Sequence, residues 1–198
     1  MSSGLDTAFV RDTYRRMADA ELIRVATQDA AGLTDEAYEI IIEEIARRNL
    51  SPDIQKGVEA QQKIPAYSIE EIDNYCELIR QLPCPISGRT DAPLNATYTE
   101  VVMSFVVITQ IEKKIVVACP DELDKASNQA SIQTALLGWW GIPWGPIRTI
   151  RALIRNGKSK GNNHSESPNN YLRSLVLAKI GQIETYRNDS EKLMSIIQ

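Results

Sequence analysis

CPISGRTDAPLNATYTEVVMSFVVITQIEKKIVVACP, residues 84–120, contains the clearest strand pattern in the chain. Residues 97–109 are rich in Val, Ile, Thr and aromatic side chains, a composition that favours β-strand. We expect a strand over 97–109, a polar turn over 110–114 and a short return strand over 115–118. Because a Cys-Pro pair stands at each end, the segment predicts a β-hairpin that is closed at its base by two cysteine turns.

Both alternating faces of the first predicted strand are apolar, so we expect other elements to cover the strand on both sides. One face carries Val101, Met103, Phe105 and Val107, and the other carries Tyr98, Val102, Val106 and Ile108.

The two cysteine turns look like the halves of a zinc ribbon from which a ligand is missing. Structural zinc takes four ligands, usually thiolates from two close pairs. Here the ligand positions are Cys84 with Ser87 and Cys119 with Glu122, and a serine hydroxyl is a poor zinc ligand. We therefore expect no metal and no other cofactor, with zinc as the alternative. Oxidation of Cys84 and Cys119 to a disulfide also stays open if their geometry permits it.

A second unusual segment is GWWGIPWGPI, residues 138–147, which holds all three tryptophans of the chain. It is neither a regular helix nor a regular strand throughout, because glycine and proline interrupt both. Three interpretations are open for Trp139, Trp140 and Trp144. They could lie at a membrane interface, form a hot spot for a protein partner, or fill the core at a tight corner.

A short helix is predicted from Pro146 onward. At 100° per residue, Arg148, Arg151 and Arg155 form one stripe, which could meet phosphates or be solvated. We expect the opposite face to be the apolar one, with Ile147, Ile150, Leu153 and Ile154.

The segment from Pro83 to Asn156 resembles a group of bacterial proteins that share paired C-P-x-C knuckles and a following G-W-W-G-x-P-W-G-P-I segment. The residues that carry the resemblance are Cys84-Pro85, Cys119-Pro120-Asp121 and Gly138 to Ile147. The resemblance implies a zinc-ribbon-like hairpin that packs against helices, and it implies no activity. The chain departs from the pattern at Ser87 and Glu122.

Helices are predicted on both sides of the hairpin, so the fold class is α+β and mostly α. In the N-terminal part, Asp19, Thr34 and Ser51 are candidate helix caps, and Ser68 with Glu71 forms a capping box. Residues 156–170 are polar and are predicted to be a flexible linker before a final helix. The expected organisation is a helical region (1–82), the hairpin with its following helix and Trp/Gly/Pro segment (83–155), the linker (156–170) and a C-terminal helix (171–198).

Composition argues against most enzyme classes. The single histidine, His164, lies in the predicted linker, and the chain has no G-x-x-x-x-G-K-[ST] or G-x-G-x-x-G motif. We therefore expect a protein that is not an enzyme. With three cysteines and no N-terminal pattern typical of secretion, we expect a cytoplasmic location, with membrane association as an addition.

Charge divides the chain into an acidic first half and a basic second half. Residues 1–100 contain 18 acidic and 10 basic side chains, and residues 101–198 contain 8 and 12. Because the whole chain is acidic, nucleic acid is not an expected partner. The simplest interpretation of this charge asymmetry is that the two halves of the chain have solvated faces of different composition.

Two functional hypotheses follow. The first is a non-catalytic protein-binding module, for example an immunity or antitoxin-like protein, whose acidic half binds a basic partner through Glu43, Glu44, Glu70 and Glu71. The alternative is a membrane-peripheral protein that uses the three tryptophans together with the arginine stripe. A metal-dependent regulator is a further alternative.

Overall fold

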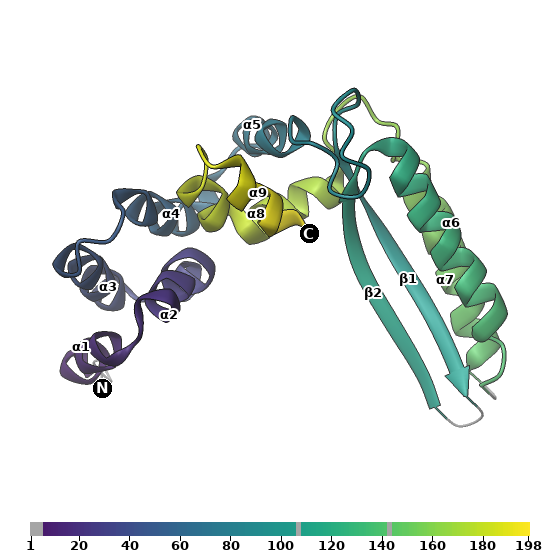
Figure 1. Ribbon diagram of the computed structural model, residues 1–198. Helices are drawn as coiled ribbons and strands as arrows, with labels where there is room; N and C mark the ends of the chain where they lie inside the picture. The colour runs from purple at the N-terminus through teal and green to yellow at the C-terminus, as the bar shows by residue number, and fades with distance from the viewer. Residues whose placement is uncertain (1–5, 106–107, 142–143) are drawn as a thin grey trace. The chain divides into compact units, whose positions relative to one another are not determined.

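The computed structural model describes residues 6–105, 108–141 and 144–198 (Figure 1). The chain divides into two compact units, which are described separately below. Unit 1 comprises Met1–Tyr75 and Val176–Ile196, and unit 2 comprises Cys76–Leu175 and Ile197–Gln198. Helices α5 (Ile69–Arg80) and α8 (Asn170–Thr185) each contribute to both units. The predicted α+β, mostly α class is confirmed, whereas these two units do not follow the predicted boundaries.

Unit 1 is helical, and it combines the N-terminal helices with the C-terminal part of the chain. A π-helical turn over Val25–Asp29 and 3-10 turns over Ala30–Gly32 and Ile64–Ala66 connect its helices. The helices are α1 (Thr7–Arg16), α2 (Asp19–Arg24), α3 (Asp35–Arg47), α4 (Pro52–Gln62) and most of α9 (Ser190–Ile197), together with the parts of α5 and α8 already given.

The predicted helix caps of unit 1 are mostly confirmed. The Thr34 hydroxyl accepts from the Ala37 amide, and Ser51 accepts from the amide of Asp53. Ser68 and Glu71 form the reciprocal bonds of a capping box. The prediction for Asp19 is wrong, because Ala18 is the N-cap residue and the Asp19 carboxylate instead pairs with Arg48 at 2.8 Å.

Apolar side chains from several helices form the core of unit 1. Leu22, Ile41 and Val58 are fully buried. Helices α4 and α8 approach closely at Gly57, where an added Cβ would lie 2.5 Å from the carbonyl oxygen of Gly181. A side chain at this position would therefore push the two helices apart.

Unit 2 contains the predicted hairpin, but its strands are longer than expected. Strand β1 (Asn95–Phe105) pairs antiparallel with β2 (Ile108–Ala118). The predicted turn over 110–114 is wrong, because Gln110 pairs with Met103 and Lys114 with Thr99 inside the ladder. The polar residues in this segment reflect the exposure of β2 and not a change of chain direction. Val106 and Val107, which we assigned to strand faces, lie outside the described residues.

Helices α6 (Pro120–Leu137) and α7 (Gly145–Lys160) follow the hairpin and pack on β1. Figure 1 shows β1 on the side of the hairpin that is nearer to these helices, with β2 farther from them. Most residues of β1 are buried or half-buried, as predicted, whereas β2 is exposed at Ile108 and over 110–115. The prediction that Phe105 and Ile108 lie on covered faces is wrong, because both are exposed. The hairpin therefore has one covered strand and one open strand.

Side chains of the two helices bond the free edge of β1. The Tyr98 amide donates to Ser159 Oγ at 2.8 Å, the Glu100 amide to Asn156 Oδ1 at 2.8 Å, and the Val102 amide to Thr134 Oγ1 at 3.2 Å. These polar groups replace the hydrogen bonds that a third strand would supply.

The predicted linker over 156–170 is wrong in its first part, because 156–160 continue α7. Asn156, Ser159, Asn163 and Asn169 are all buried. The polar composition that suggested a linker serves to satisfy backbone groups of the hairpin: Asn169 Nδ2, for example, donates to the Ala96 carbonyl at 2.6 Å.

Candidate functional site

The most distinctive surface of unit 2 is a group of large exposed apolar side chains at the end of the hairpin that is remote from the cysteine turns. We call it the distal patch. It comprises the tips of both strands, the last turn of α6, the Trp/Gly/Pro segment and the first turns of α7. Its members are Phe105, Ile108, Leu136, Leu137, Trp139, Trp140, Trp144, Ile147 and Ile150.

Small residues bring the Trp/Gly/Pro segment against the tips of the strands. An added Cβ at Gly141 would lie 2.9 Å from both Ser104 Cβ and Thr109 Oγ1, so only glycine allows this approach. The backbone thus occupies the inner position, and the indoles are left outside. Ile142 and Pro143 of the same segment lie outside the described residues.

The three tryptophans are exposed, which contradicts the interpretation that they fill the core at a corner. The exposed fractions of Trp139, Trp140 and Trp144 are 44%, 69% and 60%. Trp140 Nε1 donates to the Leu136 carbonyl oxygen at 3.1 Å. The one polar group of this indole is therefore satisfied inside the protein, and the ring can enter an apolar environment without losing a hydrogen bond to water.

Helix α7 presents three faces instead of the two that were predicted. Its buried residues are small or polar and include Thr149, Ala152 and Asn156. The isoleucines of the predicted apolar face are exposed, Ile147 by 45%, Ile150 by 49% and Ile154 by 55%. They lie outside because the side chains that α7 buries against β1 are polar and form hydrogen bonds with the strand.

The arginines of α7 differ in their pairing. Arg155 donates to the buried Glu100 carboxylate at 2.6 Å. Among the described residues, no carboxylate lies within ion-pair distance of Arg148 or Arg151. These two arginines stand beside the exposed isoleucine stripe on the same helix. The predicted arginine stripe therefore divides in two. Arg155 forms a structural ion pair, whereas Arg148 and Arg151 are cations without an acidic partner among the described residues and lie next to the distal patch.

The four acidic residues predicted to bind a partner are in unit 1 and do not form one free acidic surface. Glu44 is buried, and its carboxylate accepts from Arg47 and Arg48. Glu43 pairs with Arg11, and Glu71 pairs with Lys63 at 2.6 Å besides capping its helix. Glu70 is exposed. The burial of Glu44 contradicts its assignment to a docking surface.

The pairing of Glu44 also changes its titration. Hydrogen bonds from Arg47, and then from Arg48, lower the pKa of the Glu44 carboxyl to about 2, although burial opposes this effect. The same pair connects helices. Arg48, which is held by Glu44 at the end of α3, also donates to the Tyr14 and Met17 carbonyl oxygens and so links α3 to α1 and α2.

The cysteine turns come together at the base of the hairpin. The Cys119 amide donates to Cys84 Sγ at 3.4 Å, and Ser87 Oγ lies 3.7 Å from Cys119 Sγ. Gly88 has a φ of 71°, and its amide closes the first turn on the Cys84 carbonyl. The Glu122 carboxylate instead pairs with Lys125 at 2.7 Å. In the part of the chain that the structure describes, no group of three or more His, Cys, Asp or Glu is placed to hold a metal ion.

The environment of Cys84 has opposing effects on its thiol. Burial raises the pKa, but hydrogen bonds from the backbone of Cys119 and from Ser87 outweigh it and lower the pKa to about 7. Both Cys84 and Cys119 are free thiols and are buried.

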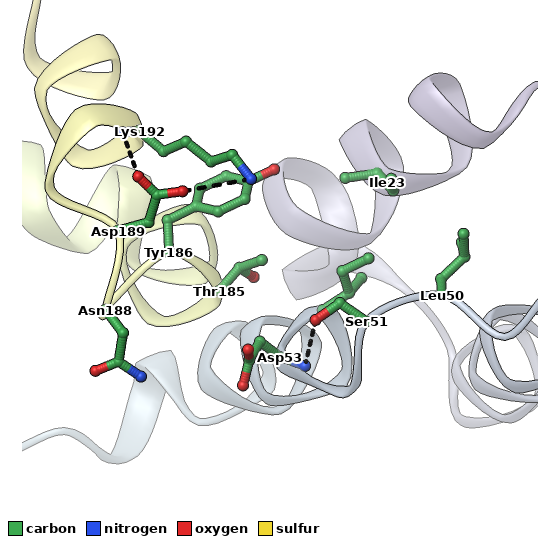
Figure 2. A pocket seen from close by; sticks show the side chains of 10 residues that line it. Ile23, Leu50, Ser51, Asp53, Thr185, Tyr186, Asn188, Asp189 and Lys192 are labelled. Carbon is green, nitrogen blue, oxygen red and sulfur yellow. Dashed lines mark hydrogen bonds and ion pairs between the residues drawn. The ribbon is translucent and has the colours of Figure 1, made fainter.

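Unit 1 contains an open cavity of about 330 Å³ that the sequence did not predict (Figure 2). Its polar lining is largely occupied by internal contacts: Lys192 pairs with Asp189 at 3.5 Å, and the Asp53 amide donates to Ser51 Oγ. Apolar walls come from Ile23, Leu50 and Ile54.

Comparisons with protein-family models, curated proteins and solved structures find no match to this chain. Among the described helices, none is both long enough and apolar enough to cross a membrane. The distal patch is therefore the candidate functional site on the evidence of its geometry alone.

Proposed function

We propose that this protein is a peripheral membrane protein that inserts the distal patch of unit 2 into the lipid–water interface. The observation that carries the proposal is the exposure of Trp139, Trp140 and Trp144 at one end of the unit, together with leucine and isoleucine side chains. Tryptophan is enriched at the level of lipid headgroups because its ring is apolar and its N–H is polar.

The change of character along α6 supports shallow insertion at one end. The outward-facing residues of its first half are polar and include Asp121, Lys125 and Gln129. In the second half they become Ile132 and Leu136, which are 60% and 66% exposed. The exposed apolar surface of α6 is thus limited to its distal end, as expected for an element that enters only the interfacial region.

The stripes of α7 favour lipid over a protein partner. A helix that lies in an interface typically has an aliphatic stripe beside a basic stripe. Ile147 and Ile150 provide the first, and Arg148 and Arg151 provide the second. Unneutralised arginines beside such a stripe suit the phosphates of anionic lipids.

The test is intrinsic fluorescence of the full chain with vesicles, because all three tryptophans belong to the distal patch. Phosphatidylcholine vesicles with and without phosphatidylglycerol are added at low salt. We expect a blue shift of the emission, protection from acrylamide quenching, and co-sedimentation of the protein with the vesicles.

Matched variants locate the binding surface. Trp140→Ser with Trp144→Ser should abolish co-sedimentation, while Phe9→Ser in unit 1, which removes an equally exposed aromatic side chain (69%), should leave it unchanged. Absence of binding to either vesicle at low salt would refute the proposal. Stoichiometric capture of a protein through the same tryptophans, without vesicle binding, would instead identify the patch as a protein hot spot.

The protein-binding module that uses acidic residues has less support. Glu44 is buried, and the carboxylates of Glu43 and Glu71 already have cationic partners inside unit 1. An immunity-like role would need free acidic side chains on one surface.

A further inference from the structure

Strand β2 has an open edge whose backbone groups point away from β1. In an antiparallel pair, alternate residues direct both their amide and carbonyl groups toward the partner strand. Tyr98, Glu100 and Val102 of β1 direct theirs to the helices. Their neighbours Thr99 and Val101 therefore bond to Lys114 and Glu112, which are their partners in the register.

The remaining residues of β2 thus present a free ladder. Ile111, Lys113 and Ile115 direct their amide and carbonyl groups outward, and no hydrogen bond to these groups is found among the described residues. Their side chains are exposed as well, Ile111 and Ile115 by 37% each. Such an edge is a template for another strand, and β1 is protected from this only because α6 and α7 bond its edge.

The sequence of β2 is complementary to itself in the antiparallel direction. When two copies are aligned about Lys113, Ile111 of each lies opposite Ile115 of the other. In the same alignment Glu112 of each lies opposite Lys114 of the other. Two aliphatic cross-strand pairs and two opposite-charge pairs are thus formed, and each type stabilises a sheet.

The two adjacent alignments are less favourable. Residues whose amide and carbonyl groups point outward must lie opposite such residues in the other copy. The register between the two strands can therefore shift only in a way that keeps them opposite one another. The adjacent alignment centred on Glu112 places two Glu112 carboxylates opposite each other and Ile111 opposite Lys113. The alignment centred on Lys114 opposes two Lys114 side chains. The alignment about Lys113 has one like-charge pair, Lys113 with itself.

We propose that two copies of this chain associate through β2 to form a four-stranded antiparallel sheet with a two-fold axis at Lys113. A two-stranded hairpin is marginal by itself, and the added ladder satisfies the outward amide and carbonyl groups of both copies. The occupant of the edge is a second copy, because the opposite charges and the isoleucines of the strand match under its own two-fold symmetry. This association is independent of membrane binding.

Disulfide trapping of the full chain tests the register. Residues of a hydrogen-bonded antiparallel pair have Cα atoms about 5.5 Å apart, which a disulfide can bridge. Lys113→Cys should therefore give a covalent dimer under mild oxidation. Glu112→Cys should give little covalent dimer, because its cysteine lies opposite Lys114 of the other copy and not opposite the second cysteine. Equal trapping at both positions, or none at Lys113→Cys, would overturn the proposed alignment.

Sedimentation velocity measures the association without cross-linking. The chain of 22.1 kDa should sediment as a dimer, and Lys113→Pro should sediment as a monomer because it removes an outward amide while sparing the bonds to β1. Lys113→Ala keeps that amide and removes the like-charge pair, so it should bind at least as tightly. A monomer at all concentrations for the unaltered chain would refute the proposal.

A charge exchange provides a further check that does not depend on proline. Glu112→Lys should weaken the dimer, and adding Lys114→Glu should restore it, because the opposite-charge pairs are then formed again with exchanged partners. Association that survives Lys113→Pro but is lost in the Trp140→Ser, Trp144→Ser variant would assign the contact to the distal patch and overturn the β2 interface.

Discussion

Asn156 of α7 binds both backbone groups of Glu100 in β1. Its Oδ1 accepts from the Glu100 amide at 2.8 Å, and its Nδ2 donates to the Glu100 carbonyl oxygen at 2.9 Å. One amide side chain thus does for this residue what a neighbouring strand does elsewhere in a sheet. This relationship explains why polar side chains are buried between α7 and β1.

Replacing Asn156 with Ala should destabilise unit 2. The substitution leaves the buried Glu100 amide without a partner and leaves the carbonyl oxygen with the Thr134 hydroxyl alone, which costs about 1–3 kcal/mol of unfolding free energy. Urea unfolding followed by circular dichroism measures the loss. Asn162→Ala, an exposed neighbour, is the control and should change stability by less than about 0.5 kcal/mol. Equal stability of the two variants would contradict the role of Asn156.

Stability should fall in acid partly because of Glu44. Its pKa in the folded state is about 2, below the ordinary value of 4.5. The stabilisation is therefore fully present above about pH 4.5 and is lost as the pH falls toward 2. Comparison of thermal midpoints between pH 6 and pH 2.5 should show a smaller decrease for Glu44→Gln than for the unaltered protein. The exposed Glu39→Gln on the same helix should follow the unaltered protein.

The three arginines of α7 should differ in their roles: Arg148 and Arg151 should contribute to lipid binding, and Arg155 should contribute to stability. Arg148→Gln and Arg151→Gln should each weaken association with phosphatidylglycerol vesicles about fivefold at low salt. The effect should shrink as salt is raised. Arg155→Gln should instead lower the unfolding midpoint, because the buried Glu100 loses its cationic partner. Loss of vesicle binding of the same size in all three variants would argue against this division.

Two glycines should respond in opposite ways to alanine. Gly57→Ala should destabilise unit 1 by about 1–3 kcal/mol, since the new methyl group would meet Gly181 and Thr185. Gly157 lies in α7 with nothing within 4 Å of an added Cβ, so Gly157→Ala should stabilise the protein by about 0.5–1 kcal/mol. Denaturant midpoints of the two variants provide the measurement.

Restoring the missing thiols should create a metal site. Ser87 already lies beside Cys119 Sγ, and the turns around Cys84 and Cys119 are formed. The double variant Ser87→Cys, Glu122→Cys should bind one Zn²⁺ or Co²⁺ per chain, with thiolate-to-cobalt absorption as the readout. Failure to bind either ion would mean that the base of the hairpin does not have the geometry of a zinc ribbon.

Local patterns were sufficient to predict most elements of the fold. Helix starts at Thr34, Ser51 and Ser68 follow from side chains that cap the nearest backbone amides, an interaction within three residues. A strand was predicted over 97–109 from its Val, Ile, Thr and aromatic content, and β1 spans 95–105. Two of the failures were the turn over 110–114 and the first part of the linker over 156–170, where polar residues have partners or exposure that local pattern does not reveal.

The sequence by itself determined the hairpin, its cysteine turns and the helices around it, because these depend on contacts between near neighbours. Only the tertiary structure decided which faces are buried. Helical spacing placed Ile147, Ile150 and Ile154 on one apolar face but did not say whether that face is buried. The groups of β1 that need α7 are backbone amides, which only polar side chains can satisfy. Burial of Asn156 and Ser159 turns the isoleucines outward. The exposed isoleucine stripe of α7 is therefore a consequence of hydrogen bonding between residues 56 positions apart in the sequence.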